Sequence, residues 1–405
     1  MQLLTNKNIL VAVTGSIAIY KTLELIRLYV QNGANVKVIL TNSAKKFITP
    51  LTFETISQQC ILDDNNENWS KDSIDNHIAI GKWADIFIIV PATANTINKL
   101  ANGISDNILL STAIAYPQMK LLCPAANTNM IENTITQESL QILKKSNYQI
   151  IEAQTKELAC RDVGNGAMAD VLDIYHCTIK ELHKDKYWNN RKVVLTGGGT
   201  IEKIDDVRYL SNFSSGKMAV NLATALYYLG ADVRLITTAN LPLTKGITVI
   251  NVKSTKEMYQ SVETQINEKV NDKKAYFFSV AAVSDYLPQT VQNGKIKKDE
   301  LGDIWNLELK KNTDILNTVK KDNIYSIGFK AELDLNLAKT NALKMLKNKN
   351  LDAVCLNIIT KENTFGSENN KIELFTHNSS LNLDKDSKIN ISLKIIKHLK
   401  EQFSE

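Results

Sequence analysis

The sequence contains few cysteines, and their arrangement argues against two kinds of stabilising site. Five cysteines are spread over the 405 residues, their number is odd, and no two of them form a Cys-x-x-Cys pair. A disulfide framework or a structural zinc site needs paired and closely spaced cysteines. We therefore expect neither, and we expect a reducing, cytoplasmic compartment.

Long apolar runs and a strong charge of either sign are also missing. No uninterrupted apolar run approaches the roughly 20 residues that cross a membrane, and the first residues, MQLLTNKNILVAVTGS, lead into a strand rather than a secretory signal. The 48 basic and 43 acidic side chains leave a formal charge of +5. This near balance does not favour a nucleic-acid or membrane partner, so we expect small-molecule ligands.

The sequence does contain a repeated alternation of short β-rich apolar runs with helical patterns. We predict strands at 9–14, 36–41, 86–91, 120–124 and 148–153, and after the charged stretch 180–191 at 193–196, 233–237, 248–252, 276–280, 325–328 and 353–357. Such alternation predicts βαβ units and parallel sheets, and 405 residues exceed what one core usually organises. The predicted fold is α/β, with two doubly wound, mainly parallel-sheet, Rossmann-like domains at 1–180 and 191–405 and a linker at 181–190.

In the first domain, small and polar residues follow the expected strands, at the edge where open α/β sheets bind ligands. Gly15 and Ser16 end the first strand and open a helix whose N-terminal amides favour an anion, although such a turn is as often empty as occupied. It is not the Gly-x-Gly-x-x-Gly of dinucleotide folds. Taken alone, His77 is more simply a capping or surface residue, and Cys160 an incidental thiol.

Several motifs in fixed order make these residues more informative together. TGSIAIYK, HIxIxxWAD, PATANTxxKxAxGxxDN, PAxNxxM and LACxDVGxG, over about residues 8–170, resemble the flavin-containing cysteine decarboxylase family. The resemblance implies a flavodoxin-like flavoprotein domain with FMN and the substrate 4′-phosphopantothenoyl-cysteine. It implies oxidation of the thiol to a thioaldehyde, loss of the carboxylate as carbon dioxide, and reduction to the product thiol.

The same resemblance assigns roles to positions of this sequence. It implies that His77 assists decarboxylation, that Asn127 holds the substrate carboxylate, and that Cys160 donates a proton from a flap. The implied FMN contacts are Gly15, Ser16, Thr93, Ala94 and Asn95. The sequence departs from the family pattern at Ala126 and Ile131, where Met and Trp are usual, and at Arg161 and Ala167 in the flap, where Gly and Arg are usual.

In the second domain, VVLTGGGTIEKIDDVRYLSNFSSGKMA, residues 193–219, is the most specific stretch. A strand ends in a glycine cluster whose amides can bind phosphate, and Ser-Ser-Gly-Lys then opens a helix. Two anion sites this close suit a phosphorylated substrate beside a nucleoside triphosphate, although no Walker A motif is present. A lysine cluster at 295–298 is either a solvated face or a triphosphate clamp.

Residues 191–376 resemble the phosphopantothenate–cysteine ligase family, which implies activation of a carboxylate by CTP with Mg²⁺. The implied intermediate is an acyl-cytidylate, from which the amine of cysteine displaces CMP. Lys295 matches the position that forms this intermediate and Asn212 the position that binds and turns it over, while Arg208 and Ala282 line the phosphopantothenate end. The implied CTP positions and their neighbours are Ser279, Val280, Ala281, Asp285, Lys311, Asn312, Thr313, Asp314, Ile315, Phe329 and Lys349, with Asp285 near the metal.

Two departures concern the nucleotide site. Thr313 replaces a usual proline, and Met345 replaces a usual lysine four positions before Lys349. The leading hypothesis is a bifunctional enzyme of coenzyme A synthesis that ligates first and decarboxylates second. The alternatives are that only the ligase half is active, or that the first domain is a flavin-binding regulatory subunit, against which Cys160 argues. The resemblance also implies a homo-oligomer with trimeric decarboxylase and dimeric ligase contacts.

Overall fold

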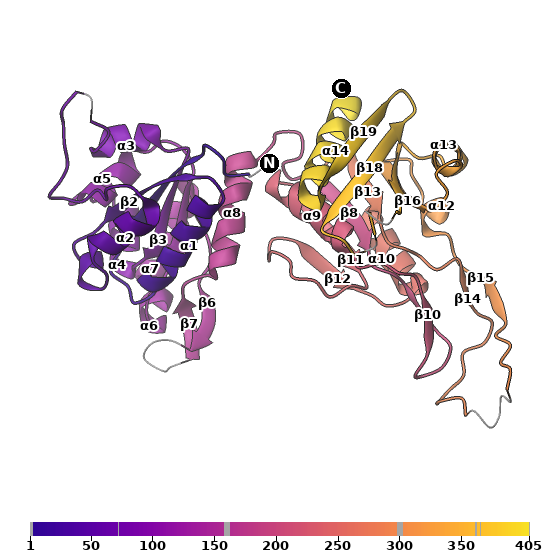
Figure 1. Cartoon of the computed structure of the whole chain (residues 1–405). Helices are drawn as coiled ribbons and strands as arrows, with labels where there is room; N and C mark the ends of the chain where they lie inside the picture. The colour runs from indigo at the N-terminus through magenta and orange to yellow at the C-terminus, as the bar shows by residue number, and fades with distance from the viewer. Residues whose placement is uncertain are drawn as a thin grey trace. The chain divides into compact units, whose positions relative to one another are not determined.

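The computed structural model describes residues 3–71, 73–157, 163–297, 303–360, 363–364 and 366–404. The chain divides into two compact units, Met1–His183 and Lys184–Glu405, drawn in Figure 1 from indigo to magenta and from magenta to yellow. The stretch 181–190, expected as a linker, is shared between them. Residues up to His183 complete helix α8 (Val171–His183) of unit 1, and Trp188 is buried within unit 2.

Unit 1 contains a five-stranded parallel sheet in the order β2-β1-β3-β4-β5. The strands are β1 (Asn8–Val13), β2 (Asn35–Leu40), β3 (Ile86–Ala92), β4 (Lys120–Pro124) and β5 (Tyr148–Ile150). This is the flavodoxin-like order, in which ligands bind at the carboxyl ends of the strands beside β1 and β3. The α/β fold class predicted from the alternation is confirmed.

Helices cover both faces of this sheet, so that strands such as β3 are buried along their whole length. The helices α1 (Ile19–Gln31) and α8 pack together on one face. The core of the other face includes side chains of α3 (His77–Trp83), α4 (Ala94–Ala101), α5 (Ile108–Ala115) and α7 (Thr134–Lys145). Shorter elements are η1 (Ala44–Lys46), α2 (Pro50–Ser57), α6 (Thr128–Glu132) and the antiparallel pair β6 (Gln154–Glu157) and β7 (Val163–Ala167).

Unit 2 contains an eight-stranded sheet in the order β12-β11-β8-β13-β16-β17-β18-β19. The parallel strands are β8 (Lys192–Gly197), β11 (Asp232–Thr237), β12 (Thr248–Asn251), β13 (Ala275–Ser279), β16 (Ile324–Glu332) and β17 (Ala353–Ile358). At one edge β18 (Asn369–Thr376) and β19 (Ser380–Ser387) continue the sheet antiparallel. The sheet is therefore mainly parallel, as predicted.

The helices of unit 2 lie on the two faces of this sheet. On one face α9 (Lys217–Tyr228) packs against α14 (Lys388–Phe403). The core of the other face includes α10 (Thr255–Asn267), α12 (Ile315–Thr318) and α13 (Ala338–Asn348). Among the described residues, no helix combines the length and apolarity needed to cross a membrane.

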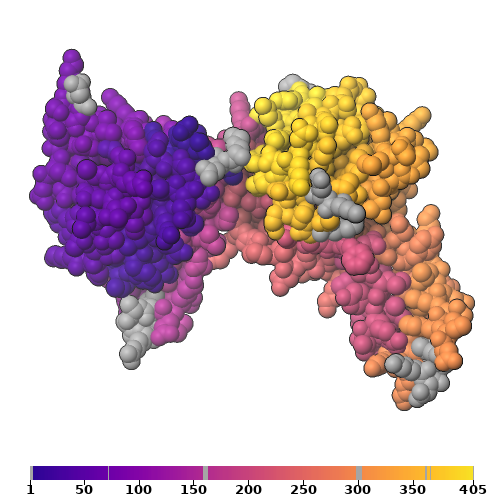
Figure 2. Space-filling model, in the orientation of Figure 1, coloured from indigo at the N-terminus to yellow at the C-terminus, as the bar shows by residue number. Residues whose placement is uncertain are grey.

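Two small antiparallel ribbons extend from the carboxyl side of the unit 2 sheet. They pair β9 (Ile201–Lys203) with β10 (Tyr209–Ser211), and β14 (Tyr286–Pro288) with β15 (Leu309–Lys311). Figures 1 and 2 show these ribbons and their connections as an arm that projects from the body of unit 2. The arm carries several residues of the predicted ligase site, including Arg208 and Lys295.

Candidate active sites in the two units

Beside Ser16, one of the predicted flavin contacts, unit 1 has a cavity of about 510 Å³ at the carboxyl edge of the sheet. This volume is typical of a pocket that encloses an organic ligand. The start of α1, the segment after β4 and the β6–β7 pair contribute its walls. The lining includes Ser16, Ile17, Tyr20, Lys21, Ala125, Ala126, Asn127, Glu157, Gly166, Ala167 and Met168.

The Gly15–Ser16 turn is shaped for close approach of the backbone to a neighbour. A Cβ atom on Gly15 would lie 2.6 Å from Cβ of Ser43, so a larger residue does not fit without movement. Ser16 partly caps the start of α1, since its hydroxyl oxygen accepts from the amide of Ala18 (3.3 Å) and its carbonyl oxygen accepts from the amide of Ile19 (3.1 Å). The N-terminus of a helix beside such a turn favours an anionic group through its dipole.

Thr14 connects this turn to the Thr93–Asn95 segment. Its hydroxyl donates to the carbonyl oxygen of Pro91 (2.7 Å) and accepts from the amide of Thr93 (3.1 Å). Thr93 in turn caps α4 through the amide of Thr96. The structure thus brings Gly15, Ser16 and the 93–95 segment to the same edge, although of these residues only Ser16 lines the cavity itself.

Asn127 lies in the cavity wall, where it caps α6 and accepts a hydrogen bond from the amide of Asn129 (2.9 Å). The segment before it packs against β7, since the amide of Ala126 donates to the carbonyl oxygen of Gly166 (3.2 Å). A Cβ atom on Gly166 would collide with the carbonyl oxygen of Ala126. Cys160 and Arg161 belong to the connection between β6 and β7 and lie outside the described residues.

His77 lies elsewhere in unit 1. It is the first residue of α3 and contributes to a different cavity of about 340 Å³, with Tyr116 and Gln118. Among the described residues, the two cavities share no lining residue. Figure 1 shows α3 and α6, which Asn127 caps, at opposite ends of the unit. Within one copy, therefore, the structure does not bring His77 and Asn127 together.

In unit 2 the glycine turn and the start of α9 form a small cavity of about 180 Å³. Gly198 and Gly216 have φ angles of +81° and +73°, which favour glycine. A Cβ atom on Gly198 would collide with the Thr238 hydroxyl. The lining includes Gly198, Ser214, Ser215, Gly216, Lys217, Val280, Ala281, Ala282, Phe329, Lys330 and Lys388.

A larger cavity of about 770 Å³ adjoins the small one. Phe329, Lys330 and the 281–282 segment line both cavities, so the two cavities adjoin along these residues. Most of the predicted nucleotide positions gather in the larger one. They are Ser279, Ala281, Asp285, Lys311, Asn312, Thr313, Asp314, Ile315, Phe329 and Lys349, and Ala282 of the predicted phosphopantothenate end lines the same cavity.

Hydrogen bonds fix the 312–314 turn in this larger cavity. The Asn312 side chain donates to Oγ1 of Thr255 and to the carbonyl oxygen of Ser284, both at 3.0 Å. Asp314 caps α12 and forms an ion pair with Lys349 at 2.6 Å. Asn312 therefore positions the turn, and the charged pair at 314 and 349 faces the cavity.

Among the described residues, Asn212, Arg208 and Lys295 do not line either cavity. The Asn212 amide donates to the carbonyl oxygen of Val283 (3.0 Å). Arg208 binds the buried Asp205 at 2.6 Å and the carbonyl oxygen of Ile296 at 2.9 Å. Burial opposes ionisation of Asp205, but hydrogen bonds from Arg208 and backbone amides outweigh it and lower the pKa of this carboxyl.

Arg208 thereby anchors the segment next to Lys295, which is exposed. Among the described residues, no group of three His, Cys, Asp or Glu side chains is arranged to hold a metal ion. Asp285 is an exposed carboxylate of the larger cavity.

Sequence reasoning gave no binding role to Lys330, although it lies in a strand-end polar segment, and it missed Lys388. Lys330 lines both cavities from β16, and its position directly after Phe329 was the available signal. Lys388 is buried at the start of α14 and binds the carbonyl oxygens of Ser367 and Asn369. Burial lowers the pKa of Lys388, against the opposing attraction of Glu368 and with a smaller contribution from the repulsion of Lys217. No local motif indicated that this distant segment returns to the cavity.

Comparison with known protein families shows that the chain combines two domains of flavoprotein-related families. Residues 1–183 match the family model Flavoprotein, and residues 188–403 match the model DNA/pantothenate metabolism flavoprotein C-terminal domain. Among solved structures, the C-terminal domain of a coenzyme A biosynthesis bifunctional protein CoaBC covers 54% of this chain and 98% of its own, with 27% identity and a TM-score of 0.44. The FMN binding protein AtHal3 covers 43% and 95%, with 33% identity and a TM-score of 0.38.

Full-length relatives identify the family. The coenzyme A biosynthesis bifunctional protein CoaBC of Vibrio parahaemolyticus is 36% identical over 407 residues, covering 99% of this chain and 100% of its own. The protein of the same name from Bacillus subtilis is 36% identical, with coverages of 98% and 97%. The chain belongs to this family of bifunctional coenzyme A biosynthesis enzymes. The predicted identity is confirmed, and the alternatives with one working half are not favoured.

Proposed function

We propose that the two units catalyse consecutive steps. Unit 2 ligates cysteine to 4′-phosphopantothenate with CTP, and unit 1 decarboxylates the resulting 4′-phosphopantothenoyl-cysteine to 4′-phosphopantetheine. The observation that supports this most is the pair of adjoining cavities in unit 2, which share Phe329 and Lys330 and contain most of the predicted nucleotide positions. The cysteine usage of the chain supports a cytoplasmic location.

In unit 2 the two compartments suit the two halves of a nucleotide substrate. Glycine amides and the ammonium groups of Lys217, Lys330 and Lys388 make the small cavity a site for phosphates. The larger cavity has room for the cytidine. The substrate carboxylate attacks the α-phosphorus, pyrophosphate leaves, and the amine of cysteine then displaces CMP from the acyl-cytidylate. Fixed cations and amides favour this step because negative charge develops on the phosphates.

Lys295, Arg208 and Asn212 are proposed to complete this site from its rim. On the arm, Arg208 donates to the carbonyl oxygen of Ile296 and so holds the backbone next to Lys295 in place. In one copy neither Lys295 nor Arg208 lines the described walls of the cavities. This placement supports a dimer in which the arm of one copy reaches the cavities of another. Asp285 is the proposed protein ligand of the Mg²⁺ that accompanies CTP.

The residues of unit 1 fit FMN at the cavity behind Gly15 and Ser16. The N-terminal end of α1, where the helix dipole is positive, suits its phosphate, and the Thr14–Thr93 connection fixes the neighbouring strand end. When bound, the flavin supplies a reversible two-electron acceptor for the substrate. Asn127 is proposed to bind the substrate carboxylate, Cys160 to donate a proton to the product, and His77 to accept a proton from the substrate.

The separation of His77 from Asn127 within one copy supports a decarboxylase site made by two copies. In a trimer with cyclic symmetry, each site would lie at the interface of two copies. One copy would contribute His77 to that site, and its neighbour would contribute Asn127. The predicted trimeric contacts of unit 1 would therefore be needed for catalysis as well as for stability.

Replacement of Cys160 tests the assignment of the two steps to separate units. The purified protein is supplied with 4′-phosphopantothenate, cysteine, CTP and Mg²⁺, and both pyrophosphate and 4′-phosphopantetheine are measured. Cys160→Ser should release pyrophosphate at the wild-type rate while losing at least about 90% of product formation, since removal of a proton-transfer group typically costs 10²–10⁴-fold. Normal 4′-phosphopantetheine formation by this variant would show that Cys160 is not the proton donor.

A further inference from the structure

A carboxylate holds the imidazole of His77. Nδ1 of His77 lies 2.7 Å from Oε1 of Glu67, and the same oxygen accepts from the backbone amide of His77 at 3.2 Å. Both side chains are about three-quarters buried, with 26% and 27% of their surfaces exposed. The indole of Trp69 meets the imidazole edge-on at 5.1 Å between ring centroids. The imidazole is thus confined on two sides.

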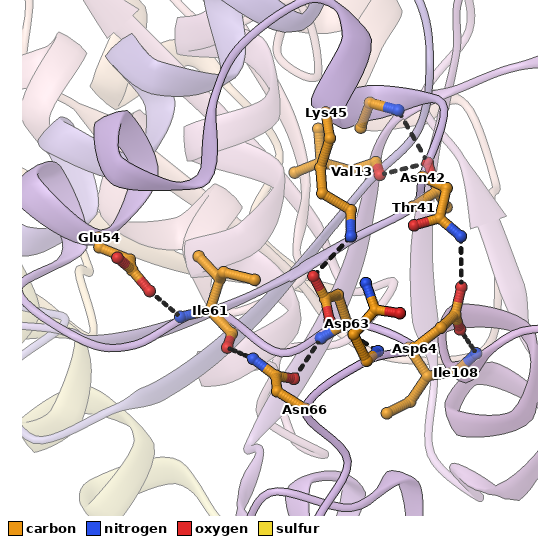
Figure 3. A network of polar contacts seen from close by, with 12 residues as sticks. Val13, Thr41, Asn42, Lys45, Glu54, Ile61, Asp63, Asp64, Asn66 and Ile108 are labelled. Carbon is orange, nitrogen blue, oxygen red and sulfur yellow. Dashed lines mark hydrogen bonds and ion pairs between the residues drawn. The ribbon is translucent and has the colours of Figure 1, made fainter.

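The segment that carries Glu67 is itself anchored to unit 1, as Figure 3 shows. Lys45 forms an ion pair with Asp63 at 2.6 Å, and Asp64 accepts from the amide of Ile108 at the start of α5 (2.8 Å). Asn66, the residue before Glu67, binds the amide of Asp63 and the carbonyl oxygen of Ile61, both at 2.8 Å. Glu67 therefore projects from a fixed segment.

The ionisation of Glu67 determines which ring nitrogen of His77 carries hydrogen. Burial opposes ionisation, but hydrogen bonds from His77 and Trp69 outweigh it and lower the pKa of the Glu67 carboxyl. An ionised carboxylate is only an acceptor, so Nδ1 must be the protonated nitrogen of a neutral imidazole. Nε2 then presents its lone pair. A histidine without such a partner has no fixed tautomer.

We propose that Glu67 is a positioning residue for the decarboxylase reaction, which keeps hydrogen on Nδ1 of His77 so that Nε2 accepts the substrate proton. The inference rests on the proposed role of His77 in decarboxylation. The proton leaves the substrate thiol for Nε2 while Nδ1–H remains bonded to Glu67, so the imidazolium that forms is stabilised by the carboxylate. Carboxylates that orient a catalytic base in this way act without contacting the substrate.

The test compares three variants of the full-length protein, supplied directly with 4′-phosphopantothenoyl-cysteine. Glu67→Ala should lower kcat for carbon dioxide release by roughly 10- to 100-fold with KM within about twofold, because proton transfer rather than binding is impaired. Glu67→Gln should retain more activity, since its amide oxygen still accepts from Nδ1–H. Asp75→Asn is the matched control, because Asp75 is in the same connection but pairs with Lys37 at 2.8 Å, and it should leave kcat unchanged.

A spectroscopic readout separates positioning from a structural role. The chain has five histidines, so ¹⁵N-histidine enrichment and solid-state NMR of the sedimented protein can resolve their ring nitrogens, with His77→Gln identifying the His77 signals. At a pH where the imidazole is neutral, the wild type should show protonated Nδ1 and bare Nε2. Glu67→Ala should shift His77 toward the Nε2-protonated tautomer.

Unchanged His77 signals in Glu67→Ala would overturn the proposal, even if kcat falls. A rise in KM with kcat preserved would overturn it as well, because Glu67 would then affect substrate binding. Absence of carbon dioxide release from the wild type would instead count against the proposed decarboxylation. The NMR comparison would still decide whether Glu67 sets the tautomer.

Discussion

At the scale of single residues, the proposed nucleotide cavity of unit 2 has an apolar side chain, Met345, at the position where the sequence resemblance implies a lysine. Met345 is half-buried on α13 and lines the larger cavity together with Lys349. Lys330 lines both cavities from β16, and its ammonium group lies 3.4 Å from Glu332. Lys330 is thus placed to give the larger cavity part of the positive charge that a lysine at position 345 would have provided.

Restoring the lysine should therefore strengthen CTP binding. In Met345→Lys, KM for CTP should fall roughly fivefold, as expected for about 1 kcal/mol from a partly exposed charge contact. Leu343→Lys is the matched control, because it adds the same charge to an exposed position of the same helix. Steady-state pyrophosphate release measures both. Equal effects of the two variants would point to general electrostatic attraction rather than to a contact in the cavity.

The ionisation of Lys120 makes the free energy of unfolding depend on pH. It is buried at the start of β4, where its ammonium group donates to the carbonyl oxygen of Tyr116 at 2.8 Å. Burial lowers the pKa of Lys120 from 10.5 to about 8. Between these values the unfolded chain holds a proton that the folded chain has released, so this group makes the free energy of unfolding increase with pH.

The measurement is the thermal midpoint Tm of the wild type and of Lys120→Met across this pH range. The wild type should gain stability relative to the variant from pH 8 to pH 10.5, and the difference should be constant below pH 7, where the lysine is charged in both states. A difference that does not change above pH 8 would show that Lys120 titrates normally in the folded protein.

At the scale of elements, the β6–β7 pair closes on the segment after β4 through contacts that only glycine permits. A Cβ atom on Gly166 would strike the carbonyl oxygen of Ala126, and one on Gly164 would strike the Thr128 hydroxyl. Gly166→Ala must therefore displace the pair from Asn127. We expect decarboxylation to fall at least tenfold while ligation is unchanged, measured as carbon dioxide and pyrophosphate release. Wild-type decarboxylation would show that this packing does not shape the site.

The elements themselves were largely predictable, and the exceptions have a common cause. The expected strands at 9–14, 36–41, 86–91 and 120–124 correspond to β1 to β4, because continuous buried apolar runs indicate central parallel strands. The hairpin strands β18 and β19 and the short ribbons β6–β7, β9–β10 and β14–β15 were not predicted. Their charged, polar or glycine positions interrupt the apolar pattern that indicates a central strand.

The site residues likewise fall into a group that the strand pattern predicted and a group that it did not. Strand-end positions such as Ser279 and Ala281, at the end of the parallel strand β13, line this cavity because parallel strands deliver their carboxyl ends to one edge. Contacts between distant loops leave no such pattern. Neither the Glu67–His77 pair nor the return of Lys388 to the small cavity could be read from spacing, since each depends on how separate segments pack.

At the scale of the whole molecule, a decarboxylase site built from two copies predicts complementation between inactive variants. His77→Gln and Asn127→Ala should each abolish carbon dioxide release alone. Co-expressed in equal amounts, they should recover about a quarter of wild-type activity, because that share of interfaces combines an intact His77 with an intact Asn127. Each variant's unchanged pyrophosphate release controls for folding. No recovery in verified mixed oligomers would place both residues in one copy.

The central claim is that one chain performs ligation and then decarboxylation. The most direct measurement is the ratio of carbon dioxide to pyrophosphate released by one preparation of the wild type, supplied with CTP, Mg²⁺, 4′-phosphopantothenate and cysteine labelled in its carboxyl group. At completion the ratio should be one, and no carbon dioxide should form when CTP is omitted. Pyrophosphate release without labelled carbon dioxide would contradict the account.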